Sequence, residues 1–122
     1  MVGNFRNNKQ TEALVTVKRK VNMAQKHVTC INKPHHQSPH EHITHIGNLA
    51  EKWRVTRETA VYEIDNNINQ YYTIDKTTGK VCFVGVVREA GKAPYLRTHA
   101  DGKYNDNLLA QPDCDSSCRI GS

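Results

Sequence analysis

The stretch QYYTIDKTTGKVCFVGVV, residues 70–87, decides the fold because it has the pattern of a β-hairpin. Tyr72 and Ile74 alternate with polar residues, and the KTTG segment that follows ends in Gly79, which suits a tight turn. The return strand VCFVGVV is apolar on both of its faces. A strand with two apolar faces belongs at the centre of a covered sheet, so we expect the sheet to be built around this hairpin.

The segment just before the hairpin, VTRETAVYEIDNN, predicts a short helix. Thr56 is a suitable N-cap, and the pair Asn66-Asn67 is a plausible end. Val61, Ile64 and Ile68 recur at helical spacing and form one apolar stripe. A helix this short gains its stability by packing such a stripe against other elements, here the predicted sheet.

Further strands are expected on both sides of these two elements. Their segments are ALVTVKRKV (13–21), HVTCINK (27–33), HITHIGN (42–48) and YLRTHA (95–100). We expect Asp101-Gly102 to end the last strand and Leu108 with Leu109 to close the core. The predicted fold class is α+β: a small antiparallel sheet with one helix packed on it, preceded by a basic arm.

The chain divides into three predicted parts. Residues 1–27 form a basic N-terminal arm that is partly disordered or an edge strand, residues 28–114 form the folded domain, and residues 115–122 form a flexible tail. The net charge is +5, and residues 1–27 hold six basic side chains against one acidic one, so the arm carries the whole excess. The remainder of the chain is neutral, which argues against a domain-wide face for DNA.

Hydropathy and cysteine content set the expected compartment. No segment is long and apolar enough to cross a bilayer, and the first residues lack the apolar core of a secretory signal. We therefore expect a cytoplasmic protein without a membrane partner, whose cysteines are reduced thiols. Cys82, inside the apolar return strand, is expected to be a small buried side chain.

Several of these segments together resemble a known family. VTCINK, PHEHITHIGN, the helix opening VTRETA and the ending YLRTHADGKYNDNLLAQPDC are similar to the DUF3892 family over about residues 28–114. The resemblance implies a compact single-domain protein of bacterial or phage origin, and it supplies no catalytic residue. The basic arm and the final DSSCRIGS lie outside the family pattern.

The stretch PHHQSPHEHITH, residues 34–45, holds five of the seven histidines and raises the question of a metal site. His40 and His42, with Cys114 and Cys118, are the candidate ligands; His42 with His45 is an alternative pair. The spacings match no closed zinc site, HExxH is absent, and Pro39 opposes a helix here. We favour a polar loop with no metal or other cofactor, in which the histidines confer pH sensitivity.

Nucleophilic catalysis is supported equally weakly. Cys30 or Cys114 can be combined on paper with a histidine and Asp113, but no local signature surrounds either thiol. Isolated glycines, among them Gly85, make no phosphate loop, and Gly85 indicates a bulge or a close backbone approach instead. We expect no catalytic residues.

Binding of an anion or a nucleic acid has better candidates. The outward face of the last strand is expected to present Tyr95, Arg97 and His99, an aromatic ring beside cationic groups. The other candidate residues are Trp53 and Arg54 before the helix and Lys18, Arg19 and Lys20 on the arm. The alternative is a purely structural face, in which Tyr95 covers the sheet and Arg97 pairs with Asp101 or Asp106.

We therefore expect a small non-catalytic binding module for an anionic partner, with nucleic acid or a nucleotide first. The alternative from another class is a protein–protein inhibitor or adaptor from a phage or mobile element that acts on a host defence complex. A zinc-stabilised domain or a hydrolase comes third. An unprotected sheet edge also makes a homodimer plausible.

Overall fold

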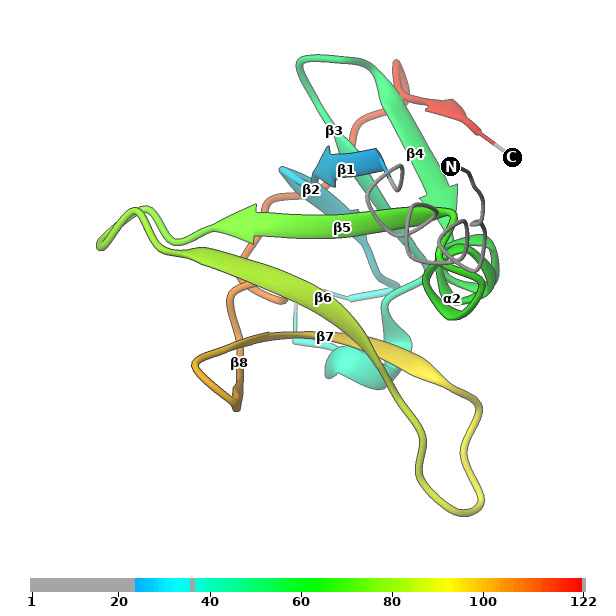
Figure 1. Ribbon diagram of the computed structural model, residues 1–122. Helices are drawn as coiled ribbons and strands as arrows, with labels where there is room; N and C mark the ends of the chain where they lie inside the picture. The colour runs from blue at the N-terminus through cyan, green and yellow to red at the C-terminus, as the bar shows by residue number, and fades with distance from the viewer. Residues whose placement is uncertain (1–23, 36, 122) are drawn as a thin grey trace, which may run out of the picture.

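The computed structural model describes residues 24–35 and 37–121, which form two β-sheets and one helix (Figure 1). The strands are β1 (Ala24–His27), β2 (Cys30–Asn32), β3 (His45–Asn48), β4 (Trp53–Thr56), β5 (Asn69–Ile74), β6 (Val81–Val87), β7 (Tyr95–Ala100), β8 (Lys103–Asn105) and β9 (Arg119–Ile120). The helix α2 is Arg57–Asp65, and a single 3-10 turn, η1, is His40–His42. The described part of the chain contains no helix long and apolar enough to span a membrane.

The α+β class is confirmed, but the prediction of one small antiparallel sheet is wrong. The five-stranded sheet has the order β1-β5-β6-β7-β8 and the four-stranded sheet the order β2-β3-β4-β9. Both are mixed, because β1 runs parallel to β5 and β9 runs parallel to β4. These two strands lie in the arm and the tail that were predicted to flank the domain. Each pairs with a strand distant in the sequence, a contact that local patterning does not report.

The predicted hairpin is confirmed as β5 and β6. Tyr72 pairs with Phe83, Ile74 pairs with Val81, and Gly79 in the turn has a φ of 75°. Strand β6 lies between β5 and β7, as its apolar composition indicated. Only one of its two faces is covered, however, because Val81 is 42% exposed and Phe83 is half-buried. Cys82 is buried with 3% of its surface exposed, also as expected.

The predicted strand 27–33 is divided between the two sheets. The backbone N–H of Val28 donates to the Tyr72 carbonyl over 2.7 Å, while the next N–H, of Thr29, donates to the Gly47 carbonyl over 2.8 Å. The chain therefore passes from the first sheet to the second at this point. Val28 and Ile31 are fully buried at the crossing, which places them in the core. Residues 13–21, the other predicted strand of the arm, lie outside the described residues.

Helix α2 begins where the sequence indicated. The Thr56 hydroxyl accepts a hydrogen bond from the Thr59 N–H over 3.1 Å, which caps the first turn. The helix ends before Asn67, whose φ is 57°. Ile68, predicted to extend the apolar stripe, lies beyond that end and is 46% exposed. The helix contributes Ala60 to the buried core. Figure 1 shows α2 beside the N-terminal end of β5.

A buried carboxylate ties α2 to the five-stranded sheet. Glu63 accepts hydrogen bonds from Asn69 Nδ2 over 2.9 Å and from the hydroxyl of Tyr71, which is fully buried. Burial, and then the hydrogen bond to Glu63, raise the pKa of Tyr71. The phenol therefore stays protonated and remains a donor to Glu63 at neutral pH.

Candidate functional site

One row of side chains runs across all five strands of the larger sheet. In the strand registers, His27 pairs with Tyr72, Tyr72 with Phe83, Phe83 with His99, and His99 with Tyr104. We call these five residues the aromatic row. Because register partners on adjacent strands point to the same side, the five rings share one face of the sheet.

The row lies on the outer face of the sheet. The residues that flank the row along β5, Tyr71 and Thr73, are fully buried, whereas Tyr72 is only half-buried. Cys82 and Val84 flank Phe83 in the same way. Strands point successive side chains to opposite faces, so the buried residues face the core and the row faces solvent. Tyr104, at the end of the row, is 55% exposed.

Four rings of the row form two neighbouring pairs. His27 and Tyr72 are stacked, with ring centroids 5.0 Å apart and planes within 2°. Phe83 and His99 have centroids 6.5 Å apart and are tilted by 41°. The Arg97 guanidinium lies 5.5 Å from the centroid of the Tyr104 ring. The row therefore consists of two aromatic pairs, with the Arg97–Tyr104 contact at one end.

The His99 ring packs against Gly85, where the absence of a side chain leaves room for it. A Cβ built on Gly85 would lie 3.1 Å from His99 Cδ2 and 3.4 Å from His99 Nε2. The close approach at Gly85 is therefore made by the His99 side chain and not by backbone, since the Arg97 carbonyl oxygen is 3.8 Å from the same position. Any larger residue at Gly85 would displace His99.

Two surface hollows flank the row. One, of about 250 Å³, is lined by the carboxamides Asn67, Asn69 and Gln70 together with Phe83 and His99, among others. The other, of about 350 Å³, is lined by His99, Gly102, Lys103 and Tyr104. The row thus has amide groups on one side and an exposed lysine on the other.

The structure separates the residues predicted for anion binding. His99 belongs to the aromatic row, and Arg97 adjoins it, bonded to Asp106 Oδ1 over 3.0 Å. Tyr95 is buried with 6% of its surface exposed, so it offers no free ring. The ion pair with Asp106 and the burial of Tyr95 are the features of the structural alternative.

The remaining predicted residues lie away from the row. Trp53 and Arg54 are on β4 of the four-stranded sheet. The Trp53 ring lies 6.1 Å from that of Tyr71, and Arg54 donates to Asn32 Oδ1 over 2.8 Å. Lys18, Arg19 and Lys20 lie outside the described residues.

Sequence reasoning missed four of the five row residues: His27, Tyr72, Phe83 and Tyr104. Tyr104 had a usable signal, because Asp101-Gly102 is a two-residue hairpin turn with φ values of 55° and 77°. That signal predicts a strand after the turn, namely β8. The places of His27, Tyr72 and Phe83 in the row depend on the strand registers. These registers cannot be predicted from the alternation of residues within one segment.

The histidine-rich stretch is not a metal cluster in the described part of the chain, where the metal-capable groups of three or more contain no histidine. His40 Nε2 lies 3.3 Å from Asp106 Oδ1. The 3-10 turn η1 begins at His40 despite Pro39, because proline precedes the turn as its N-cap, where no N–H is required. His42 is exposed within the same turn.

Burial, followed by the charge of Arg97, lowers the pKa of His40, against the opposing effects of Asp106 and Glu41. Burial likewise lowers the pKa of His45, with a smaller contribution from Arg54. The ordinary pKa of a histidine is 6.5. As the pH falls below this value, His40 and His45 are therefore protonated in the unfolded chain before they are protonated in the folded one. The contribution of these two histidines to the free energy of unfolding should consequently be fully present above that pH and decrease below it.

We expect urea unfolding to show a lower free energy of unfolding at about pH 5.5 than at about pH 7.5. The double substitution His40→Gln and His45→Gln should flatten this dependence. His35→Gln is the matched control, since His35 is exposed. An equal pH dependence in the double variant and the control would contradict the assignment.

A second cluster consists of three cysteines. Cys30 and Cys114 form a disulfide, so the expectation that these two are reduced thiols is corrected. The fold brings them together because the Cys114 N–H donates to the Ile31 carbonyl over 2.9 Å, and the Ile31 N–H donates to the Pro112 carbonyl over 2.9 Å. Cys118 is a buried free thiol beside them, whereas the tail that carries it was predicted to be flexible.

Comparison with known proteins gives one match. No curated protein and no solved structure matches the chain. A family model described as "Protein of unknown function (DUF3892)" matches residues 27–112, a segment that contains β2 to β8, α2 and the aromatic row. The chain therefore belongs to the DUF3892 family.

Proposed function

We propose that the protein binds nucleic acid with unpaired bases through the aromatic row. The observation that carries the proposal is the alignment of His27, Tyr72, Phe83, His99 and Tyr104 on one outer sheet face. Exposed aromatic rings on a sheet are a general means of stacking unpaired bases, because every base has a π-face.

The dimensions of the row suit several successive bases. Neighbouring strands are about 4.8 Å apart, so a row across five strands spans about 19 Å. A base that stacks on Phe83 would have the rings of Tyr72 and His99 on either side of it. Duplex DNA buries its base faces in its own stack, which is why the proposal is restricted to unpaired bases.

The groups beside the row supply contacts of two other kinds. Lys103 lines the hollow next to Tyr104 and can meet a phosphate, whereas Arg97 is already paired with Asp106. Asn67 and Gln70 line the opposite hollow, and carboxamides can both donate to and accept from base edges. The basic arm ends in β1, which carries His27. Most of the arm's basic residues therefore come shortly before this end of the row in the sequence.

Fluorescence anisotropy with a labelled single-stranded oligonucleotide of about twelve mixed bases tests the proposal. We expect saturable binding at low salt that weakens as salt rises, and weaker binding to the matching duplex. Phe83→Ala and Tyr72→Ala should each reduce the affinity by about fivefold to 150-fold, since stacking contributes about 1–3 kcal/mol per base.

Tyr62→Ala is the control, because Tyr62 is 61% exposed on α2 and does not belong to the row. A second comparison replaces Lys18, Arg19 and Lys20 together by alanine, which should reduce the salt dependence rather than the preference for single strands. Absence of binding at low salt, or equal affinities of Phe83→Ala and Tyr62→Ala, would exclude the proposal.

The protein–protein inhibitor remains the second candidate, favoured by one surface feature. A mainly apolar hollow of about 300 Å³ lies between α2 and the β6–β7 loop, lined by Val61, Tyr62, Ala93 and Pro94 among others. Affinity capture from a host lysate should then recover one stoichiometric protein that resists nuclease treatment. Loss of that protein with Tyr62→Ala, but not with Phe83→Ala, would assign the contact to this hollow.

A further inference from the structure

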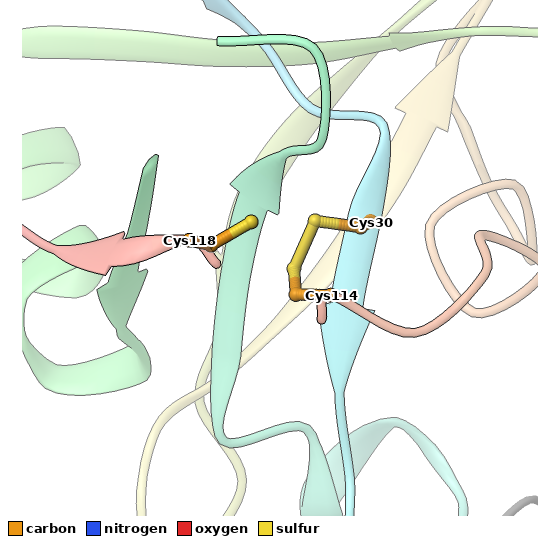
Figure 2. Close-up of side chains that lie close together, drawn as sticks. All are labelled: Cys30, Cys114 and Cys118. Carbon is orange, nitrogen blue, oxygen red and sulfur yellow. A yellow bond between two sulfur atoms is a disulfide. The ribbon is translucent and has the colours of Figure 1, made fainter. Parts of the chain in front are cut away.

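Three sulfur atoms converge within the four-stranded sheet, away from the aromatic row. The Sγ atoms of Cys30, Cys114 and Cys118 all lie within 4.8 Å of one another. Figure 2 shows the Cys118 side chain directed toward the Cys30–Cys114 disulfide. All three residues are buried, with 0%, 7% and 3% of their surfaces exposed.

The backbone around this cluster is held by contacts that do not involve sulfur. Cys30 is on β2, and the segment at Cys114 is bonded to β2 through the backbone of Ile31. Cys118 is held by β9, in which the Arg119 N–H donates to the Lys52 carbonyl over 3.0 Å. The three thiols therefore come from separately anchored segments that meet at one point.

A carboxylate lies near one of the three sulfurs, that of Cys118. Asp115 Oδ1 is 4.0 Å from Cys118 Sγ. The same oxygen accepts a hydrogen bond from the Ser117 N–H over 2.9 Å, and Lys52 Nζ donates to the Ser117 hydroxyl over 3.0 Å. These contacts hold the exposed Asp115 side chain in place next to Cys118. The outer contacts of metal ligands commonly serve this purpose.

We propose that, when the disulfide is reduced, Cys30, Cys114 and Cys118 bind one Zn²⁺ ion, with the Asp115 carboxylate as the fourth ligand. Tetrahedral zinc has Zn–S distances of about 2.3 Å, which places neighbouring sulfurs about 3.8 Å apart. In the oxidised chain the Cys30 and Cys114 sulfurs are bonded to each other and separate when the bond is reduced, while Cys118 Sγ already lies within 4.8 Å of both. Three thiolates and one carboxylate are a donor set suited to zinc.

The step that opens the site is a two-electron reduction. A dithiol reductant donates two electrons and two protons to the Cys30–Cys114 bond, which breaks to give two thiols, and the reductant becomes a disulfide. Binding of Zn²⁺ then displaces the three thiol protons to solvent. The disulfide and the zinc complex are thus alternative states of one site, and the redox poise of the compartment selects between them.

Titration of the full chain with Zn²⁺ tests this proposal, after treatment with a phosphine reductant and removal of any affinity tag. We expect one Zn²⁺ per reduced chain and none per oxidised chain, measured by elemental analysis and a chromophoric zinc competitor. Co²⁺ in place of Zn²⁺ should give intense thiolate-to-cobalt absorption with the visible bands of tetrahedral cobalt.

Cys118→Ala leaves the disulfide intact and should weaken zinc binding by the reduced chain by on the order of a hundredfold, while Asp115→Asn should weaken it by about tenfold. Cys82→Ala is the matched control, since Cys82 is also a buried free thiol but lies in the other sheet. Equal zinc affinities of Cys118→Ala and Cys82→Ala would overturn the proposal.

Loss of folding on reduction would not obscure the result. If circular dichroism shows that the reduced chain unfolds, one equivalent of Zn²⁺ should restore the native spectrum, because metal binding is coupled to folding. A reduced chain, folded or unfolded, that binds no Zn²⁺ would refute the site. The nucleic-acid proposal is unaffected by that outcome, since none of these residues lies on the five-stranded sheet.

Discussion

Replacing Cys30 and Cys114 together by alanine should lower the free energy of unfolding by about 2–5 kcal/mol. The disulfide joins residues separated by 84 positions, so its loss releases a long loop in the unfolded chain. It also attaches the segment after β8 to β2, the edge strand of the four-stranded sheet. Urea unfolding of the wild-type and double-alanine proteins, both without reductant, measures the difference.

A reductant provides the matched control for this prediction. In metal-free buffer it should destabilise the wild-type protein by a similar amount and leave the double-alanine variant unchanged. Cys82→Ala should respond to the reductant as the wild type does, because Cys82 is a free thiol. Equal stability of the wild-type protein with and without reductant would show that the disulfide does not contribute to folding.

Leu108→Ala should destabilise the protein by about 2–5 kcal/mol. Leu108 is fully buried in the core formed by both sheets and α2. Its N–H donates to Thr98 Oγ1 over 3.0 Å, which holds the chain against the inner face of β7. Because Asn107 beside it is bonded to Thr73 as well, the backbone has little freedom to move into the cavity.

Leu109→Ala is the comparison that makes this result specific. Leu109 is the same residue type at the next position, but it is only partly buried at the margin of the core. We expect a loss of about 1 kcal/mol, which thermal or urea unfolding can separate from the effect at Leu108. Equal losses of stability in the two variants would mean that Leu108 and Leu109 are buried to the same extent, and would contradict this prediction.

These two residues illustrate how far the sequence reaches. The pair was recognised as a closing apolar element, but its burial depends on the bonds of Asn107 and Leu108 to β5 and β7. The same holds for the candidate site. His99 was identified from the exposed pattern of one strand, whereas Tyr72 and Phe83 were recognised only as strand residues.

The sequence by itself determined the elements whose signals are local. The cap at Thr56, the hairpin 70–87 and the strand 95–100 follow from residues only a few positions apart, whose preferences act in the chain before any sheet exists.

The tertiary structure decided the rest. The parallel partners of β1 and β4, the Cys30–Cys114 disulfide and the common face of the aromatic row all join residues that are distant in sequence. Such contacts form only when packing sets the strand registers, and a shift of one residue would turn every ring of a strand to the opposite face.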